Sequence, residues 1–358
     1  MGGRTFRVGI VGGNATRAWA HDAHVPALRK MTDRFVIEAV SARTQERAEE
    51  ARAAFGANRA FGDSLELVRD PDIDIVAITV KVPEHRPLVL AALKAGKHVY
   101  CEWPLGRDLA EAEEMAAAVP ADSHVAIGLQ ALSAPAVRHA AKLVREGALG
   151  DLLVARVFSP TAGWGEAAPP FYAYLQDKRN GATLETIAGG HTLAMIEYVV
   201  GSYVELDART TITHPVLPII GTDEVVERTC ADHMLVLGKH DGGCVSTLEV
   251  TGGVGDRPFG FELVGTKGSL RLSSSFPGGF QGGAISLETS SEIEPVPAQS
   301  IESLRMAAIN VSEVWLRLAA DIESGERTVP DFAYAVRLSK LLETIDTASA
   351  TGARQTLS

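Results

Sequence analysis

Residues that could bind phosphate stand near the start of the chain, where Gly12-Gly13-Asn14 follows the apolar run Phe6–Val11. The next segment carries apolar residues at helical spacing, so we expect a strand, a tight turn and a helix in succession. Backbone N–H groups of such a turn and the positive end of its helix attract a pyrophosphate. The G-x-G-x-x-G template falls on Gly12, Asn14 and Arg17, so only its first glycine is present. The turn therefore predicts a dinucleotide site, and the alternative is an α/β turn that binds nothing.

Donors suited to a ribose phosphate follow the second β-rich run, residues 35–40. In a dinucleotide domain this position recognises the adenosine ribose, and an acid there accepts from the 2′-hydroxyl. This chain has Ser41, Arg43 and Thr44 instead. Hydroxyls and a guanidinium suit a 2′-phosphate, so we expect NADP(H) to be preferred, with NAD(H) possible. The alternative is that Arg43 is a solvated residue at the start of a helix over residues 45–54.

The elements that position these residues alternate between strand and helix patterns as far as residue 129. This alternation predicts a doubly wound parallel sheet of the Rossmann type, with ligands at the carboxyl ends of its strands. We therefore expect a nucleotide-binding domain over residues 1–129. Its predicted strands are residues 6–11, 35–40, 73–80, 98–101 and 124–129.

Residues 130–358 have a different pattern, with longer alternating segments separated by glycine-rich turns. This pattern favours a C-terminal α/β domain with a large, open, mostly antiparallel sheet that has one covered face. The other face is a candidate dimer surface. Two final helices are predicted at about residues 303–324 and 331–351, separated by Val329-Pro330.

Composition excludes several classes of protein. The 358 residues are 46% hydrophobic and 22% charged, which is ordinary for a globular protein of two domains. A formal net charge of −11 disfavours nucleic acid as a partner, and no apolar run is long enough to cross a membrane. The chain enters its first strand without a basic and apolar leader. Three widely spaced cysteines argue against a disulfide framework, so we expect a cytoplasmic protein.

Three segments at the predicted carboxyl edge resemble one family. They are Val80-Lys81-Val82-Pro83-Glu84-His85, Glu102-Trp103-Pro104 and Gly189-Gly190-His191. Their order and spacing resemble the glucose-fructose oxidoreductase, inositol dehydrogenase and rhizopine catabolism (Gfo/Idh/MocA) family. Within it the chain is most similar to the galactose-regulon repressor of yeasts and its bacterial relatives. The resemblance implies hydride transfer between NAD(P) and a sugar-like carbon, or a nucleotide-binding regulator, and a dimer or tetramer formed through the C-terminal sheet.

The resemblance also assigns residues to the cofactor and the substrate. The family's usual lysine after the fifth strand is replaced by Trp103, and the aspartate four residues before the histidine by Ile187. Of the family's lysine, aspartate and histidine, His191 alone remains. The resemblance implies substrate contacts by Trp103, Tyr174, Lys178 and His191. It also implies cofactor contacts by Val80, Pro83, His85, Glu102 and Trp103. These add to the cofactor residues already named from the sequence, which are Gly12, Gly13, Asn14, Ser41, Arg43 and Thr44.

The remaining chemistry requires one proton to be exchanged with the substrate while the cofactor carries the hydride. His191 has a suitable intrinsic pKa, and its alternative role is a structural hydrogen bond. Lys81 replaces the proline of the family's usual Thr-Pro pair and is a second catalytic candidate. Its alternative role is a hydrogen bond to a ribose hydroxyl or a loop carbonyl. Trp103 could form an apolar wall against a ring, or it could fill the core.

A metal site is not expected, because His21 and His24 have no acid or cysteine at ligand spacing. His24 is instead interpreted as starting or packing the first helix. The sequence thus predicts an NADP(H)-dependent oxidoreductase acting on a small polyhydroxylated substrate or a related C=O or C=N compound. The alternative is a catalytically silent NAD(P)-binding regulator that acts through protein contacts.

Overall fold

The computed structural model describes residues 4–290 and 294–357 and divides the chain into two compact units. The first comprises Met1–Gln130 and Ser300–Val336, and the second Ala131–Gln299 and Arg337–Ser358. The two-domain expectation placed everything after residue 129 in the second domain. The structure differs in one respect, because residues 300–336 return to the first unit.

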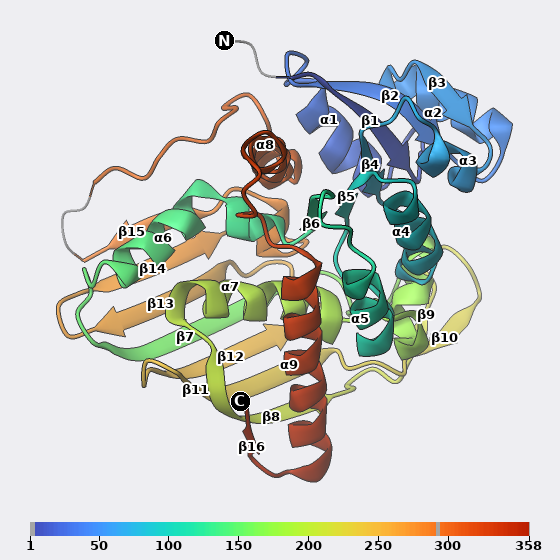
Figure 1. Ribbon diagram of the computed structural model, residues 1–358. Coiled ribbons are helices and arrows are strands. Elements are labelled where there is room, and N and C mark those ends of the chain that lie inside the picture. The colour runs from blue at the N-terminus through green and yellow to red at the C-terminus, as the bar shows by residue number, and fades with distance from the viewer. Residues whose placement is uncertain (1–3, 291–293, 358) are drawn as a thin grey trace. The chain divides into compact units, whose positions relative to one another are not determined.

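A six-stranded parallel sheet in the order β3-β2-β1-β4-β5-β6 forms the centre of the first unit (Figure 1). This order is that of a doubly wound nucleotide-binding sheet, so the predicted Rossmann architecture is confirmed. The central strands are nearly continuous apolar runs, as expected for strands covered on both faces. The strands are β1 (Phe6–Val11), β2 (Phe35–Ser41), β3 (Arg59–Phe61), β4 (Ile75–Ile78), β5 (His98–Cys101) and β6 (Val125–Ile127).

Local capping defines where several helices of the first unit begin. Thr44, Asp63 and Asp108 each accept a backbone N–H at the start of a helix, which satisfies donors that the helix cannot pair internally. The helices are α1 (Val25–Leu28), preceded by a π-helical turn at Ala20–His24, then α2 (Gln45–Phe55), α3 (Ser64–Arg69), α4 (His85–Lys94) and α5 (Leu109–Ala117).

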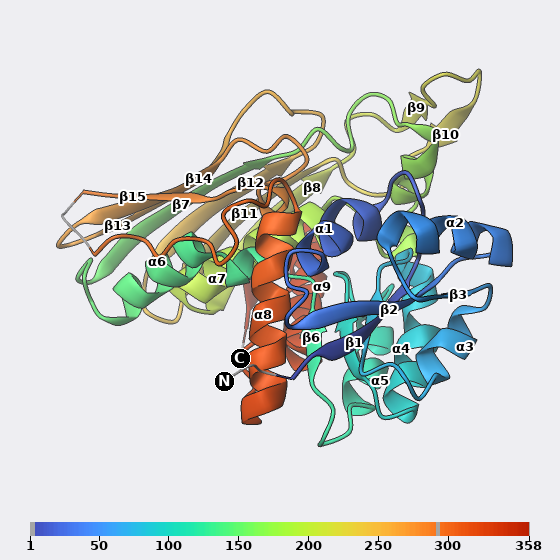
Figure 2. The same cartoon turned by 90° about the horizontal axis from the view of Figure 1, so that it is seen from above.

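Helix α8 (Ala308–Ser324) completes the core of the first unit, and Figure 2 shows it beside α1. Its apolar face joins the cluster that contains Phe6, Leu28 and Phe35. Trp315 at its centre is fully buried, with its ring centroid 5.3 Å from that of Phe35. This helix is therefore an integral part of the first unit despite its late position in the chain.

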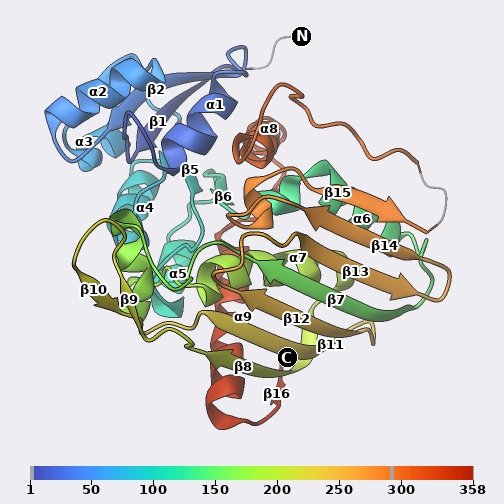
Figure 3. The ribbon, with the colours of Figure 1, turned by 180° about the vertical axis from the view of Figure 1, so that it is seen from behind.

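An eight-stranded mixed sheet organises the second unit, in the order β15-β14-β13-β7-β12-β11-β8-β16 (Figure 3). All its pairings are antiparallel except that of β7 with β12, which confirms the expected large, mostly antiparallel sheet. Helices α6 (Pro135–Arg145) and α7 (Gly190–Val200) pack on one face. The strands are β7 (Leu152–Pro160), β8 (Tyr203–Thr211), β11 (His233–His240), β12 (Val245–Thr251), β13 (Phe259–Gly265), β14 (Ser269–Ser274), β15 (Ser286–Thr289) and β16 (Gln355–Thr356).

The opposite face of this sheet exposes apolar side chains. In β11, Met234 and Val236 are buried while Leu235 and Leu237 are 42% and 57% exposed, as the two-residue period of a strand requires. A separate hairpin pairs β9 (Val216–Pro218) with β10 (Val225–Glu227), and α9 (Phe332–Thr351) ends close to the short β16 in sequence. Among the described residues, no helix combines the length and the apolar character needed to span a membrane.

Candidate functional site

The glycine turn after β1 is held tightly against its neighbours. The N–H groups of Gly12 and Gly13 both donate to the carbonyl oxygen of Ser41, at 3.2 and 2.8 Å. Gly12 has a φ of +107°, and a Cβ there would lie 2.9 Å from Thr79 Oγ1, whereas a Cβ on Gly13 would lie 2.5 Å from Val40 Cγ2. Neither position therefore has room for a side chain. The two glycine N–H groups are already paired, so, contrary to the expectation, they shape the turn rather than face an anion.

Asn14 orders the residues that follow the turn. Its Oδ1 accepts from the backbone N–H of Thr16 at 3.1 Å and of Arg17 at 3.2 Å. This local pairing is typical of an Asx turn and fixes the backbone between the strand and the first helix. Asn14 is thus a predicted cofactor residue whose side chain organises the turn.

Two cations flank the glycine turn from the ends of β2 and β4. Arg43 and Lys81 are both exposed, and the pKa of Lys81 is lowered by desolvation and by the positive charge of Arg43. The turn lies between the ends of these two strands, because β1 pairs with β2 on one side and with β4 on the other. The carboxyl edge of the sheet therefore carries positive charge on both sides of the glycine turn.

The residues at the end of β2 differ from the expectation in one case. Ser41 is fully buried and its Oγ lies 2.9 Å from Ser64 Oγ, so its hydroxyl does not face an external ligand. Thr44 caps α2 by accepting from Arg47 N–H at 3.3 Å, and it remains exposed next to Arg43. Arg43 and Thr44 are thus the remaining predicted donors for a ribose phosphate.

His85 ties together the segments that follow β4 and β5. Its Nε2 lies 3.0 Å from the carbonyl oxygen of Val80, and its Nδ1 lies 3.0 Å from that of Pro104 and 3.2 Å from that of Leu105. The ring is 1% exposed, and burial lowers its pKa. The expectation for His85 was cofactor contact. The structure instead makes it an internal link that positions Val80.

The segment after β5 is enclosed. Trp103 is 6% exposed and Pro83, in the short 3-10 turn Val82–Glu84, is half-buried. Glu102 is also half-buried, and its Oε1 lies 2.7 Å from Nε2 of His24. Sequence reasoning missed this contact because it assigned His24 to the packing of the first helix.

In the second unit, His191 lies near the start of α7 and is 5% exposed. Burial lowers its pKa to about 3, so the imidazole is neutral near pH 7. Its Nδ1 is buried and has no hydrogen-bond partner among the described residues. A buried ring nitrogen without a partner costs about 1–3 kcal/mol of stability.

Glu185 was not anticipated from the sequence. It precedes Ile187 by two residues in the π-helical turn Glu185–Gly189, and its Oε1 accepts from Ala231 N–H at 2.9 Å. Its Oε2 is buried without a partner among the described residues, and desolvation raises the pKa of the carboxyl. The sequence could have indicated Glu185, because it is an acidic residue two positions before Ile187, where the family pattern has an aspartate.

The loop before this segment carries the other predicted substrate residues. Tyr174 belongs to the 3-10 turn Pro170–Gln176, its carbonyl accepts from Asn180 Nδ2 at 2.8 Å, and burial raises the pKa of its phenol to about 12. Lys178 is exposed, and its backbone N–H donates to Thr229 Oγ1 at 3.0 Å. In the described residues, no group of three or more His, Cys, Asp or Glu side chains could hold a metal ion.

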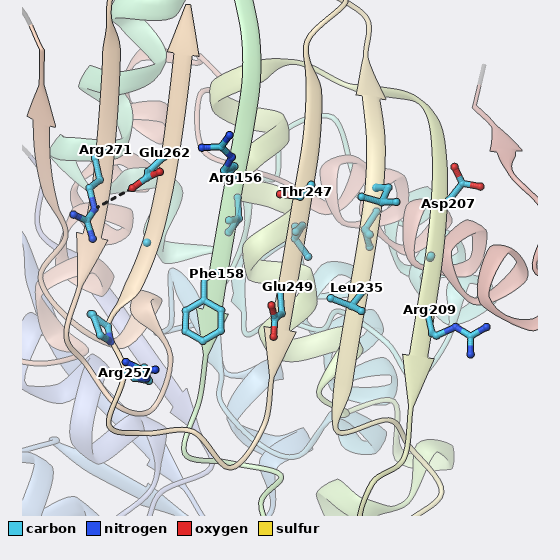
Figure 4. A pocket seen from close by; sticks show the side chains of 17 residues that line it. Arg156, Phe158, Asp207, Arg209, Leu235, Thr247, Glu249, Arg257, Glu262 and Arg271 are labelled. Atoms are coloured by element: carbon cyan, nitrogen blue, oxygen red, sulfur yellow. Dashed lines mark ion pairs between the residues drawn. The ribbon is translucent and has the colours of Figure 1, made fainter.

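A cavity of about 840 Å³ lies on the open face of the second unit's sheet (Figure 4). Apolar side chains, such as Phe158 and Leu235, share this face with charged ones, and Arg271 pairs with Glu262 at 4.0 Å. All its lining residues belong to the sheet unit, and none is a residue that the sequence assigned to cofactor or substrate. Its position instead coincides with the face that the sequence marked as a candidate dimer surface.

Comparison with known proteins gives two family matches. Residues 6–129 match the model described as "Oxidoreductase family, NAD-binding Rossmann fold", and residues 135–274 match "Gal80p, C-terminal domain". The dehydrogenase aclE of Aspergillus oryzae is 34% identical over 229 residues, which cover 62% of each chain. The galactose/lactose metabolism regulatory protein GAL80 of Kluyveromyces lactis is 29% identical over 292 residues, covering 75% of this chain and 64% of that protein. The match thus spans somewhat less than two thirds of each of these relatives.

Solved structures give the same picture of the fold. A super-repressor mutant of Gal80p from Saccharomyces cerevisiae aligns with a TM-score of 0.86 at 23% identity, covering 99% of this chain and 98% of that one. Levoglucosan dehydrogenase in complex with NADH and levoglucosan aligns with a TM-score of 0.81 at 23% identity, covering 99% of both chains. Residues 6–129 are thus similar to the NAD-binding domain of the Gfo/Idh/MocA oxidoreductases, and residues 135–274 are similar to the C-terminal domain of Gal80p.

Proposed function

We propose that this protein is an NADP(H)-dependent oxidoreductase that transfers hydride to or from a small polyhydroxylated substrate or a related C=O or C=N compound. The observation that carries the proposal is the glycine turn at the carboxyl edge of the first sheet. There, Gly12 and Gly13 leave no room for a Cβ, and Arg43 and Lys81 supply positive charge on either side. Two cations beside a turn at this edge of a doubly wound sheet suit the phosphate oxygens of a dinucleotide.

The preference for NADP(H) over NAD(H) rests on the end of β2. Arg43 can pair with the oxygens of a 2′-phosphate, and Thr44 is exposed next to it. No carboxylate stands at this position to accept from a free 2′-hydroxyl. The bound nicotinamide would supply the hydride chemistry, and the protein would supply binding, orientation and one proton exchange.

His191 is the proposed acid/base. Burial keeps its ring neutral, and its unpartnered Nδ1 costs about 1–3 kcal/mol, which a substrate hydroxyl could recover by donating to it. In this role the ring nitrogen takes the hydroxyl proton during oxidation and returns it during reduction. Lys81 is the second candidate, with a role either in proton transfer or in binding the cofactor.

Trp103, Tyr174 and Lys178 complete the proposed substrate contacts. The indole of Trp103 offers an apolar wall for a ring face, and Lys178 offers a charge for polar groups. The test is to mix purified protein with NADP⁺ or NADPH and a panel of sugars, polyols, ketones and imines while following nicotinamide absorbance. Turnover that His191→Asn abolishes, with nucleotide affinity retained, supports the assignment. Full turnover in that variant refutes His191 as the acid/base.

A regulator without turnover is the second candidate, and specific observations favour it. Trp103 and Ile187 replace two polar residues of the family's catalytic set, and the second domain is of the Gal80p type. In this case the nucleotide acts as a signal, and the chain binds a protein partner. Tight nucleotide binding with no absorbance change across the whole panel would favour the regulator over the enzyme.

We further propose that the chain forms a homodimer or tetramer through the open face of its second sheet, and that it works in the cytoplasm. Leu235 and Leu237 expose apolar surface there, and the three cysteines are free and buried. Light scattering on Leu237→Glu should give a smaller species than the wild type. Val225→Glu is the matched control because Val225 is 68% exposed but lies on the separate β10 strand. Equal masses for wild type and Leu237→Glu would refute this interface.

A further inference from the structure

His24 stands between two residues that are far away in the sequence. The ring is fully buried at the end of the π-helical turn Ala20–His24. Trp315 Nε1 donates to its Nδ1 at 3.2 Å, and its Nε2 lies 2.7 Å from Glu102 Oε1. The rings of Tyr100 and Trp315 pack edge-on against it, with centroids at 4.9 and 5.8 Å. The imidazole is thus fixed by two hydrogen bonds and two aromatic contacts.

This arrangement defines the tautomer of His24. An indole N–H can only donate, so Nδ1 of His24 must accept and carries no proton. The ring proton is therefore on Nε2, which donates to the carboxylate of Glu102. The chain of hydrogen bonds runs in one direction, from Trp315 through His24 to Glu102.

Glu102 is confined from a second side as well. It directly follows β5, and its backbone N–H donates to the carbonyl oxygen of Ile78 at 3.1 Å. A Cβ on Gly128 would lie 2.5 Å from Glu102 Oε2, so the glycine allows the carboxylate to occupy its present position. One oxygen is held by His24 and the other lies against Gly128. The side chain is consequently held in one orientation at the carboxyl edge of the sheet.

We propose that His24 and Trp315 are positioning residues that orient Glu102 for the nicotinamide-bearing half of the dinucleotide. This inference rests on the proposed function. Glu102, an implied cofactor contact, follows β5, which lies in the half of the sheet opposite the β1–β3 half that receives the adenosine. Trp315 belongs to α8, so the returning segment Ser300–Val336 contributes directly to the geometry of the nucleotide site. The role explains why a late helix carries a buried tryptophan whose N–H meets a histidine near the start of the chain.

The test compares His24→Leu with His24→Gln by titration calorimetry. Leucine removes the donor to Glu102, whereas the glutamine amide can still donate near the position of Nε2. Loss of a hydrogen bond to a charged group predicts a decrease in NADPH affinity of about 10- to 100-fold for His24→Leu. His24→Gln should recover most of that loss, and Trp315→Phe, which keeps a ring but removes the N–H, should show an intermediate loss.

A second ligand separates positioning from a general structural defect. Adenosine 2′,5′-bisphosphate lacks the whole nicotinamide-bearing half, so all three variants should bind it as tightly as the wild type does. His240→Leu is the matched control, because His240 is also fully buried and paired through both ring nitrogens, but in the second unit. It should lower the melting temperature and leave NADPH affinity unchanged. Parallel losses for both ligands in the His24 variants would overturn the proposal.

The remaining outcomes are distinct. If the wild type binds NADPH and His24→Leu binds it equally well, the positioning role fails and the proposed function stands. If the wild type binds neither NADPH nor NADH, the proposed function fails, and the positioning role fails with it. A nitrogen-15 spectrum of the wild-type histidine rings gives an independent check. A His24 proton on Nε2 agrees with the proposal, and a proton on Nδ1 overturns it without any nucleotide being present.

Discussion

Replacing Gly12 by alanine should damage both the stability of the first unit and its nucleotide binding. Gly12 has a φ of +107°, which a residue with a side chain adopts only under strain of about 1–3 kcal/mol. The new Cβ would also lie 2.9 Å from Thr79 Oγ1 and 3.1 Å from the Thr79 carbonyl carbon. Thr79 Oγ1 donates a hydrogen bond to the Val11 carbonyl oxygen at 2.7 Å, so the Thr79 side chain cannot rotate away from the new Cβ without losing that hydrogen bond. The backbone must move instead.

The two effects together give an expected loss of about 2–6 kcal/mol in the free energy of unfolding, because forcing extra atoms into a packed site costs about 1–3 kcal/mol by itself. For a folding unit of roughly 150–250 residues, each kcal/mol lowers the melting temperature by about 2–4 °C. The displaced turn is also the proposed pyrophosphate site. We therefore expect a weaker affinity for NADPH as well as a lower melting temperature.

Gly96→Ala is the matched control for this experiment. Gly96 also has a positive φ, +71°, but a Cβ there has no heavy atom within 4 Å. This variant has only the backbone strain, about 1–2 kcal/mol, and should bind NADPH normally. Melting curves and calorimetry on both variants provide the comparison. If Gly12→Ala matches Gly96→Ala in melting temperature and in nucleotide affinity, the tight turn is not what the site depends on.

Three further predictions concern charge and protonation. Arg43→Ala should weaken NADPH binding about tenfold and leave NADH binding unchanged in calorimetry. The expected loss is modest because an exposed guanidinium contributes less to the binding free energy of a 2′-phosphate than a buried one would. Equal effects on both nucleotides would contradict its role. Burial lowers the pKa of His191 to about 3, whereas the pKa in an unfolded chain is about 6.5. The contribution of this group to the free energy of unfolding should therefore be complete above pH 6.5. On acidification towards pH 3 it should fall by up to about 1.4 kcal/mol per pH unit. Denaturant curves between pH 7 and 5 should show a shallower fall for His191→Asn than for the wild type. Burial raises the pKa of every cysteine thiol, that of Cys230 to about 12, so a thiol-specific reagent should label none of them until the protein is unfolded.

The sheet of the first unit could be predicted because each of its long strands is a buried apolar run. Strands β1 and β5 have the expected bounds, and β2 extends one residue further than predicted. The short strand β3 (Arg59–Phe61) was missed, since its three residues are only partly buried and form an edge. Short edge strands carry little of the periodic signal on which such predictions depend. Helix α9 also has nearly the expected bounds, whereas α8 begins five residues later than predicted.

The destination of α8 could not be read from local sequence. Its apolar face is equally compatible with packing in either unit, and the structure places it in the core around Phe6 and Phe35. A long-range contact of this kind depends on which surface remains uncovered after the sheet has formed. The hydrogen bond between Trp315 and His24 spans 291 positions, so no local pattern could have indicated it.

The same distinction between local sequence pattern and long-range packing applies to the site residues. The positions of Gly12 and Gly13 followed from a strand and turn pattern, which is local. The orientation of Ser41 did not, because its hydroxyl is turned inward by Ser64 from the start of α3. His85 was assigned by resemblance to the cofactor, yet three carbonyl groups from two loops surround its ring. Sequence patterns locate the carboxyl edge of the sheet, and packing decides which side chains are exposed there.

The choice between enzyme and regulator depends on the second unit, because both functions need the same nucleotide site in the first. The segment from Glu185 to His191 lacks the family's aspartate at Ile187, but it retains an acid and a base in buried surroundings. Desolvation raises the pKa of Glu185 and lowers that of His191, so each is shifted towards its uncharged form. A neutral imidazole can accept a proton, and a carboxyl can donate one when it is protonated. These two groups are the candidates for proton transfer in the second unit. If the chain is an enzyme, Glu185→Gln and His191→Asn should each abolish the turnover that the wild type shows in the nicotinamide absorbance assay, whereas a regulator shows no turnover in any of the three proteins.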